Sequence, residues 1–257
     1  AYSGNIPKLT GYLAVVNSNY QNVKNDNYFK IFPGLRLDLS SRISTTVVYR
    51  IDREMAKNSR YDGEKWSGWA GFAENSTIEY KSSDFGISAG IERLSWGFGR
   101  TGNLMFSREA MPMTMLGFYY RRRLFEFRSV TGFLNPLKEE LDRTGHDSSY
   151  FTGQQRYISA HSLTIYPLNG LSISLREGVI YGGPGRRFEL AYSVPILWYH
   201  GQQLNSRMDD NTFMSFGADY RYKGKYWIYG EIFIDDYQIE KKRRGDNEPN
   251  EIAFIVG

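Results

Sequence analysis

Residues 214–222, Met-Ser-Phe-Gly-Ala-Asp-Tyr-Arg-Tyr, and residues 226–234, Tyr-Trp-Ile-Tyr-Gly-Glu-Ile-Phe-Ile, indicate the fold class most clearly. In both stretches one set of alternate residues is apolar or aromatic and the other set carries the charges, which is the two-residue period of a β-strand. The intervening Lys223-Gly224 predicts a tight turn. The two stretches therefore predict one long hairpin with a lipid-compatible face and a charged face.

The same pattern recurs along the chain, with connections that alternate between short and long. Short connections are expected near Ser40-Ser41, Ser82-Ser83, Arg121–Arg123, Asn169-Gly170 and Lys223-Gly224. Long polar connections are expected at 53–76, 94–112, 134–156, 183–208 and 237–250. Hairpins that are closed tightly at one end and loosely at the other are typical of transmembrane β-barrels. We therefore predict an all-β, antiparallel, up-and-down transmembrane β-barrel.

The charged faces of these strands predict a water-filled lumen. The residues expected to line it are Arg36, Asp38, Arg50, Glu126, Arg128, Asp219, Arg221 and Glu231. The alternative is a soluble sandwich, in which so many opposite charges would be costly to bury. Strands of about 9–11 residues also match the thickness of a bilayer, whereas soluble strands run to about 5–6. Glu177 interrupts the apolar phase of its strand, and we expect a bulge there that turns it inward.

Composition excludes several other classes of protein. The mean hydropathy of the 257 residues is −0.50, and no window approaches the roughly 18 apolar residues of a membrane helix. The chain has no cysteine, which excludes thiolate metal sites and thiol catalysis. Although the net charge is +4, lysine and arginine are interleaved with carboxylates, so we expect no nucleic-acid partner.

The two ends of the sequence suggest a piece of a longer barrel. The chain begins at Ala1 without a signal peptide, and residues 252–257 resemble the opening of a further strand. We expect one barrel domain over residues 1–257, truncated at its C-terminal end. It would supply about twelve strands of a larger barrel.

Two catalytic patterns occur, and neither has the context that its chemistry needs. Residues 97–102 fit a dinucleotide-binding glycine pattern but do not lead into a helix. Ser88 fits a nucleophile pattern but lies in the middle of a predicted strand instead of a strand-to-helix turn. The three histidines have no metal-ligand spacing. We expect no catalytic residue, no metal and no cofactor, and hence no enzyme.

The long connections carry the side chains best suited to a ligand. Aromatic rings can stack on the CH faces of sugars while charged and amide groups bond to the hydroxyls. The candidate carbohydrate-binding residues are Trp66, Trp69, Trp96, Arg100, Trp198, Tyr199 and His200. The alternative for each is that it packs its own loop or plugs the lumen.

Several stretches of the sequence resemble one known family. They are Gln154-Gln-Arg-Tyr-Ile-Ser-Ala-His-Ser-Leu-Thr-Ile-Tyr-Pro167, Leu171-Ser-Ile-Ser-Leu-Arg-Glu-Gly-Val-Ile-Tyr-Gly-Gly183, Phe188-Glu-Leu-Ala-Tyr-Ser-Val-Pro-Ile-Leu-Trp-Tyr-His200 and Ile228-Tyr-Gly-Glu-Ile-Phe-Ile-Asp-Asp-Tyr-Gln238. Ser95-Trp-Gly-Phe-Gly-Arg100 is similar as well. In this order they resemble the Wzi capsule-assembly family of outer-membrane β-barrels.

The resemblance implies a bacterial outer-membrane barrel of about 18 strands with a plugged lumen. It further implies a lectin-like surface protein that attaches or organises capsular polysaccharide. The expected partners are capsular or surface polysaccharide, the lipid bilayer and lipopolysaccharide. Two other functions remain open: a porin or specific channel with a charged lumen, and an outer-membrane hydrolase that uses Ser88.

Overall fold

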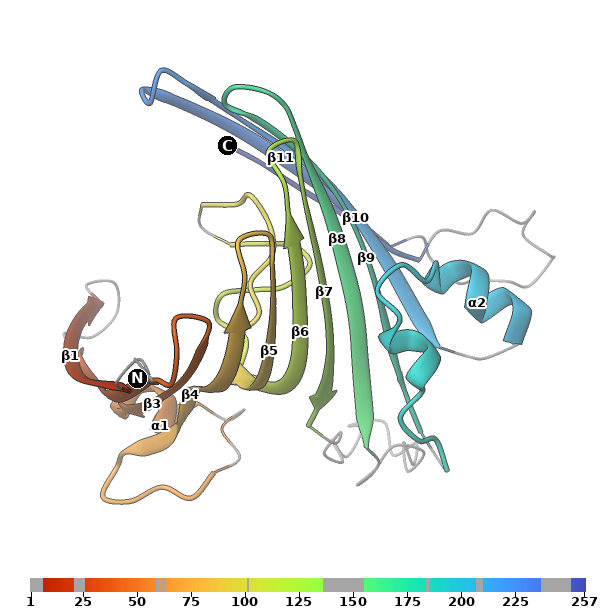
Figure 1. Ribbon diagram of the computed structural model, residues 1–257. Coiled ribbons are helices and arrows are strands. Elements are labelled where there is room, and N and C mark those ends of the chain that lie inside the picture. Colours follow the sequence, from red (N-terminus) through yellow and green to blue (C-terminus); the bar gives the residue numbers. More distant parts are fainter. Residues whose placement is uncertain are drawn as a thin grey trace, which may run out of the picture. The chain divides into compact units, whose positions relative to one another are not determined.

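The computed structural model describes residues 7–20, 26–58, 61, 63–100, 102–135, 155–183, 185–206, 210–236 and 251–257. The chain divides into two compact units, Ala1–Arg93 and Leu94–Gly257. Each unit is a run of antiparallel strands, and the strands follow one another in chain order (Figure 1). The prediction of an all-β, antiparallel, up-and-down fold is confirmed.

The first unit contains five strands and one short helix. They are β1 (Lys8–Tyr20), β2 (Asp26–Asp38), β3 (Ile43–Asp52), α1 (Arg53–Lys57), β4 (Ala70–Lys81) and β5 (Phe85–Glu92). Each strand pairs with the next in an antiparallel ladder. The sequence reading missed β1. It also placed the start of β4 inside a loop over 53–76, whereas the connection between β3 and β4 covers only residues 53–69.

The described residues of the second unit form seven strands and two short helical segments. They are β6 (Met113–Arg121), β7 (Phe125–Leu134), β8 (Arg156–Leu168), β9 (Leu171–Gly182), η2 (Leu190–Ser193), α2 (Tyr199–Ser206), β10 (Asn211–Tyr222), β11 (Tyr226–Asp236) and β12 (Glu251–Val256). Consecutive strands again pair antiparallel. Of these, the β10–β11 hairpin has the register that its alternation predicts, with Tyr222 opposite Tyr226.

The connections alternate in length as expected. The short ones cover residues 39–42, 82–84, 122–124, 169–170 and 223–225, and the connections that follow β3, β5, β7, β9 and β11 are much longer. The exception is the connection between β1 and β2, which has only five residues. Aromatic side chains flank the short turns, because Tyr80 lies 5.7 Å from Phe85 and Tyr120 lies 5.8 Å from Phe125, measured between ring centroids. Aromatic residues at the ends of the strands, beside the turns, are typical of the interfacial girdle of a membrane barrel.

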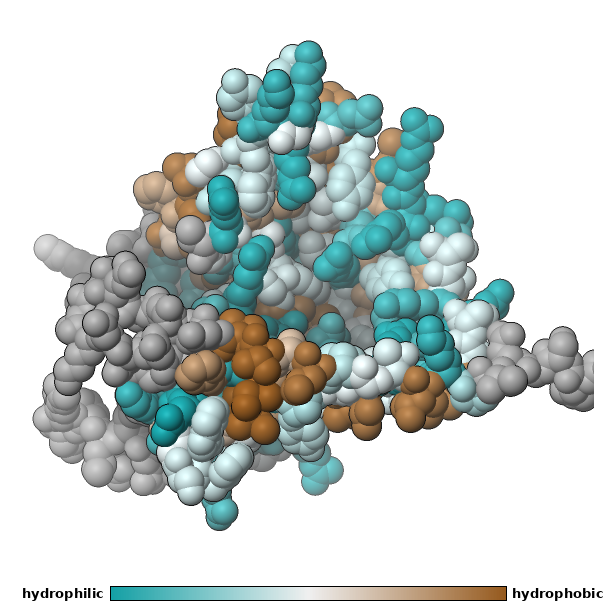
Figure 2. Space-filling model, turned by 90° about the vertical axis from the view of Figure 1, so that its left-hand side faces the viewer, coloured by the Kyte–Doolittle hydropathy of each residue, from teal (hydrophilic) through white to brown (hydrophobic). Residues whose placement is uncertain are grey.

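The two faces of the strands differ as the period-2 pattern predicts. We call the face that carries the charged residues the inner face and the opposite one the outer face. On β9 and β10 the outer residues Ile173, Leu175 and Phe216 are exposed, while the inner residues Ser174 and Ser215 are buried. Figure 2 shows hydrophobic side chains gathered in patches on the molecular surface beside hydrophilic ones. An apolar exposed face opposite a polar buried one is the reverse of a soluble sheet.

The bulge expected at Glu177 is absent. Strand β9 pairs without a register shift along Glu177 with both β8 and β10, so Glu177 stays on the outer face with Leu175 and Val179. It is buried there because a segment of the connection between β9 and β10 covers it. The break in apolar phase therefore reflects a change in what covers the strand, and the backbone stays regular.

Two long connections of the second unit pack on opposite faces of its strands. Residues 94–112 lie on the inner face, where Trp96 and Leu94 form an apolar cluster with Met115, Val130 and Ala160. The segment that contains η2 and α2 lies on the other side of β8 and β9, as Figure 1 shows. None of the described helices has the length and apolar character that crossing a membrane requires.

Candidate functional site: a charged groove on the inner face

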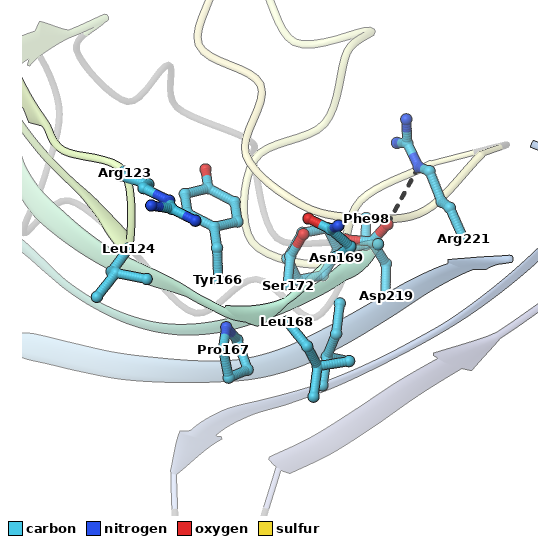
Figure 3. A pocket seen from close by; sticks show the side chains of 12 residues that line it. Phe98, Arg123, Leu124, Tyr166, Pro167, Leu168, Asn169, Ser172, Asp219 and Arg221 are labelled. Atoms are coloured by element: carbon cyan, nitrogen blue, oxygen red, sulfur yellow. Dashed lines mark hydrogen bonds and ion pairs between the residues drawn. The ribbon is translucent and has the colours of Figure 1, made fainter. Parts of the chain in front are cut away.

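A groove of about 690 Å³ lies on the inner face of the second unit beside the short turns. Its walls come from the β6–β7 turn, the end of β8, the β8–β9 turn, and β10, with Phe98 of the 94–112 loop above them. Arg123, Tyr166, Ser172 and Asp219 point to one side of the strands, and Leu124 and Leu168 point to the other (Figure 3). The sheet thus separates a polar groove from an apolar outer surface.

A bulge in β8 shapes this groove. The pairing of β8 with β9 shifts between Ile165 and Leu168, so one extra residue is inserted at Tyr166-Pro167. Pro167 has no N–H to lose from the ladder, while the N–H of Tyr166 donates to the carbonyl of Leu124 at 2.8 Å. Bulges commonly re-aim side chains beside functional sites. Here the bulge sits where the Tyr166 ring enters the groove.

The β8–β9 turn needs a glycine at one position. Gly170 has a φ of +83°, which L side chains rarely adopt. Its carbonyl accepts the Arg221 N–H at 2.8 Å, and a Cβ at this position would lie 2.3 Å from the carbonyl oxygen of Arg221. The turn is therefore held directly against β10, and this contact fixes the spacing between the two sides of the groove.

The groove carries two differently held guanidinium groups. Arg221 bonds to the buried carboxylate of Asp219 at 3.2 Å and lies 4.8 Å over the ring of Trp227. Arg123 is exposed, and within the described part of the chain it forms no ion pair. A guanidinium without a carboxylate partner can bond to an anionic or hydroxylated ligand.

A second, smaller cavity of about 170 Å³ continues from the groove along the inner face. The two share Phe98, Tyr166 and Ser172. In the smaller cavity, Glu126 is buried and accepts from the guanidinium groups of both Arg121 and Arg128. This carboxylate is neutralised by its neighbours, so the positive charge of the wall exceeds the negative charge there.

Arg176 and Glu231 hold the 94–112 loop on the inner face. They are buried and form an ion pair of 3.5 Å. The carboxylate of Glu231 accepts the backbone N–H of Phe98, and the Arg176 guanidinium lies 4.9 Å from the centroid of the Phe98 ring. A buried pair with these additional partners is fully satisfied, and it places the Phe98 ring over the groove.

The predicted lumen residues of the first unit also lie on an inner face, where each forms an ion pair. Arg36 bonds to Asp38 at 2.8 Å. Arg50 bonds to the buried Asp52, whose carboxylate also caps helix α1 through the N–H of Glu54 at 2.7 Å. All eight predicted lumen residues are thus on the faces opposite to the exposed apolar residues. That they line a water-filled lumen stays a prediction.

The predicted carbohydrate-binding residues lie in different surroundings. Trp66 and Trp69 form a tight hairpin with their rings 6.5 Å apart, and Trp66 is 56 % exposed. Trp96 is buried in the apolar cluster, and Arg100 is exposed on the same loop. Trp198 is 63 % exposed, whereas Tyr199 is fully buried. The structure therefore does not gather these residues into one site.

Sequence reasoning missed a polar cluster on the outer face. Glu177 accepts the backbone N–H of Tyr199 at 3.2 Å and that of His200 at 3.0 Å, at the start of α2. Its oxygens also lie 3.2 Å from Nε2 of His161 and 3.6 Å from Nδ1 of His200. Glu177, His161 and His200 are far apart in sequence. The only sequence feature that pointed to this cluster was the interrupted apolar alternation at Glu177. Neither this cluster nor any other group of three or more His, Cys, Asp or Glu side chains among the described residues is arranged so that it could hold a metal ion.

The groove is suited to binding a saccharide. It offers a phenol ring at Tyr166, the neutral polar groups Asn169 and Ser172, and the guanidinium groups Arg123 and Arg221. Rings pack on the CH faces of a sugar, and hydroxyls bond to amide and hydroxyl groups. The guanidinium groups add a preference for carboxylate or phosphate substituents.

Comparisons with known proteins point to one family. The family described as capsule assembly protein Wzi matches residues 34–249. A solved structure of Wzi from Escherichia coli, described as an outer membrane protein involved in group 1 capsule assembly and a carbohydrate-binding β-barrel, matches with a TM-score of 0.53 at 13 % identity. The match covers 91 % of this chain and 49 % of that chain, so the present chain spans about half the length of the solved protein. No curated protein matches the sequence.

Proposed function

Because the chain belongs to the Wzi capsule-assembly family, we propose that it forms part of a bacterial outer-membrane β-barrel that binds capsular polysaccharide without acting on it as an enzyme. The observation that carries this proposal is the groove of about 690 Å³, which combines ring, amide and guanidinium groups on the inner face. The apolar outer face supports a membrane location.

The groove favours an acidic saccharide over a neutral one. Arg123 is exposed and has no ion-pair partner among the described residues, so a ligand carboxylate would not have to displace one. Tyr166 supplies the adjacent ring. Short turns of outer-membrane barrels face the periplasm, so the groove would meet the polysaccharide at that end of the barrel. Trp66 and Trp69 are on a long connection, which would lie at the opposite end of the barrel, and they are the alternative contact region.

A channel is the less favoured function. Residues 94–112 pack on the inner face and are fastened there by Arg176 and Glu231. A loop anchored in this way obstructs the path that ions would take along the charged wall. A hydrolase based on Ser88 is disfavoured as well, since Ser88 lies in the regular ladder of β5 opposite Glu79 and on no strand-to-helix turn.

The test uses two neighbouring arginines of one turn. In the full-length protein in detergent, both ends of the barrel are accessible to an acidic capsular oligosaccharide. We expect Arg123→Gln to weaken binding about tenfold, because one charged hydrogen bond contributes about 1.5 kcal/mol. Isothermal titration calorimetry gives the dissociation constant.

Arg122→Gln is the matched control, because Arg122 donates to the hydroxyl of Tyr120 at 2.7 Å and is not among the groove-lining residues. It should leave affinity unchanged. Equal effects of the two substitutions would show that the groove is not the binding site. In that case Trp66→Ala tests the loop site in the same assay.

A further inference from the structure

The outer face of the second unit changes character along its strands. Near the short turns it carries the exposed apolar residues Leu163, Leu175 and Phe216, which are opposite one another in the ladder. Further along it carries Glu177 beside His161, and then Ser159 and Thr131, whose hydroxyls are 3.0 Å apart. Lipid offers no hydrogen-bond partner to such groups, so a membrane-facing wall needs a cover there.

The connection between β9 and β10 supplies that cover. We call residues 186–206 the outer strap. The ring of Phe188 stacks 6.0 Å from Phe133, and the ring of Tyr199 lies 4.7 Å from His161. The hydroxyl of Tyr192 donates to Asp210 at 2.7 Å. The strap thus turns its hydrogen-bonding groups and buried rings toward the wall.

The opposite side of the strap is apolar and exposed. Leu190 is 76 % exposed, Ile196 83 %, Trp198 63 % and Val194 47 %. A surface element of a water-soluble protein places its apolar residues inward and its polar residues outward. The outer strap has the reverse arrangement, with the carboxylate of Glu177 and the ring of His161 beneath it and four large apolar side chains above.

We propose that the outer strap is embedded in the outer leaflet of the membrane, where Leu190, Val194, Ile196 and Trp198 contact lipid acyl chains. The surface that they form lies on the same face as the apolar wall of β8–β10 and replaces it where the wall turns polar. Long connections of outer-membrane barrels lie at the extracellular end, which selects the outer leaflet. Trp198, predicted above as a carbohydrate contact, becomes a lipid contact.

This inference rests on the proposed membrane location, and the test separates the two. The full-length protein is reconstituted into phosphatidylcholine vesicles whose acyl chains are brominated or unmodified. An environment-sensitive fluorophore is attached to a single introduced cysteine at Ile196→Cys, at Leu175→Cys on the wall, or at Lys65→Cys on an exposed loop. Bromine quenches the fluorophore only on contact within the hydrocarbon.

We expect quenching at position 196 to be comparable to that at 175 and well above that at 65. Quenching at 175 without quenching at 196 would overturn the outer-strap proposal while the membrane barrel stands. Absence of quenching at both would refute the membrane location as well. Polysaccharide binding by the same preparation reports separately on the binding proposal.

A second measurement avoids the attached label. Trp198→Phe removes one tryptophan and keeps an apolar ring at the same place. If Trp198 lies in the hydrocarbon, the variant should lose part of the tryptophan emission that brominated lipid quenches. An unchanged quenchable fraction would contradict the proposal.

Discussion

Gly170 determines the geometry of the groove at the scale of one residue. Its φ is +83°, and a Cβ added to it would lie only 2.3 Å from the backbone carbonyl oxygen of Arg221 in β10. Any L side chain at this position would be strained by the positive φ, and its Cβ would push the turn away from Arg221. The separation between Asn169 and Arg221 in the groove therefore depends on the absence of a side chain at this position.

Gly170→Ala should lower the free energy of unfolding by about 1–3 kcal/mol and weaken saccharide binding in addition. The measurement is urea unfolding of the full-length protein in detergent together with calorimetric titration. Gly224→Ala is the control: Gly224 has a similar φ of +68° but no atom within 4 Å of its Cβ position. This variant should lose stability because of the positive φ, but its affinity for the saccharide should be unchanged. Equal losses of affinity in both variants would contradict a role for the close approach to Arg221.

Two tyrosines fasten the outer strap at the scale of one element. Burial, together with the neighbouring Asp210, raises the pKa of the Tyr192 phenol above its usual 10.0. Burial and the neighbouring Glu177 raise that of Tyr199 in the same direction. Both phenols must therefore stay protonated for the strap to remain in place.

The outer strap should detach at alkaline pH. A group whose folded pKa is raised contributes its stabilisation fully below the unfolded pKa and loses it as the pH rises toward the folded value. The loss should therefore begin above pH 10.0, the ordinary tyrosine value. Hydrogen exchange of residues 188–206 against that of β9 measures it. Tyr192→Phe should reduce the pH dependence, and exchange that is independent of pH would contradict the assignment.

The sequence predicted the strands in which apolar residues alternate regularly but not those in which the alternation is interrupted or occurs on both faces. In β10 and β11 the apolar phase persists over the whole hairpin, so its register followed from the pattern. In β4 the stretch Glu74–Ser76 contains no large apolar residue and was assigned to a loop, although Glu74 is held there by Arg93 at 2.6 Å. In β1, apolar residues occur on both faces, at Val15 and Val16, which obscures the period.

The candidate site was predictable only in part, for a related reason. The charged residues Asp219, Arg221, Glu126 and Arg128 followed from alternation alone. Their assembly into a groove depends on the bulge at Tyr166 and on the Phe98 contact with Glu231, which joins residues 133 positions apart. Glu177 was misassigned because local periodicity cannot show that a distant segment covers an outer face.

At the scale of the whole molecule, substitution by lysine should change the stability of the protein differently on the two faces of the strands. Leu175→Lys places a charge on the outer wall and should destabilise the membrane-inserted protein by up to about 2–4 kcal/mol. Ser172→Lys, three residues earlier on the inner face, should be nearly neutral, because position 172 opens into the groove opposite Asp219. Urea unfolding in vesicles compares the two. Similar losses would contradict the assignment of faces.

The same two faces explain how one sheet can serve membrane and ligand together. In the proposed barrel the outer face meets lipid through alternate apolar residues. On the inner face, Arg36, Arg50, Arg128 and Arg176 are each paired with a carboxylate. The 94–112 loop occupies part of the inner face, and the outer strap completes the outer one. Polysaccharide binding should therefore depend on the inner face and be insensitive to substitutions on the wall.

The most direct test of the central proposal is binding of acidic capsular polysaccharide to the full-length protein in detergent, with heat-modifiable migration on a gel as the check of folding. We predict saturable binding that Arg123→Gln weakens about tenfold and Arg122→Gln leaves unchanged, with every variant still heat-modifiable. A folded, heat-modifiable protein that binds no polysaccharide, or binds it equally well in both variants, would contradict the account.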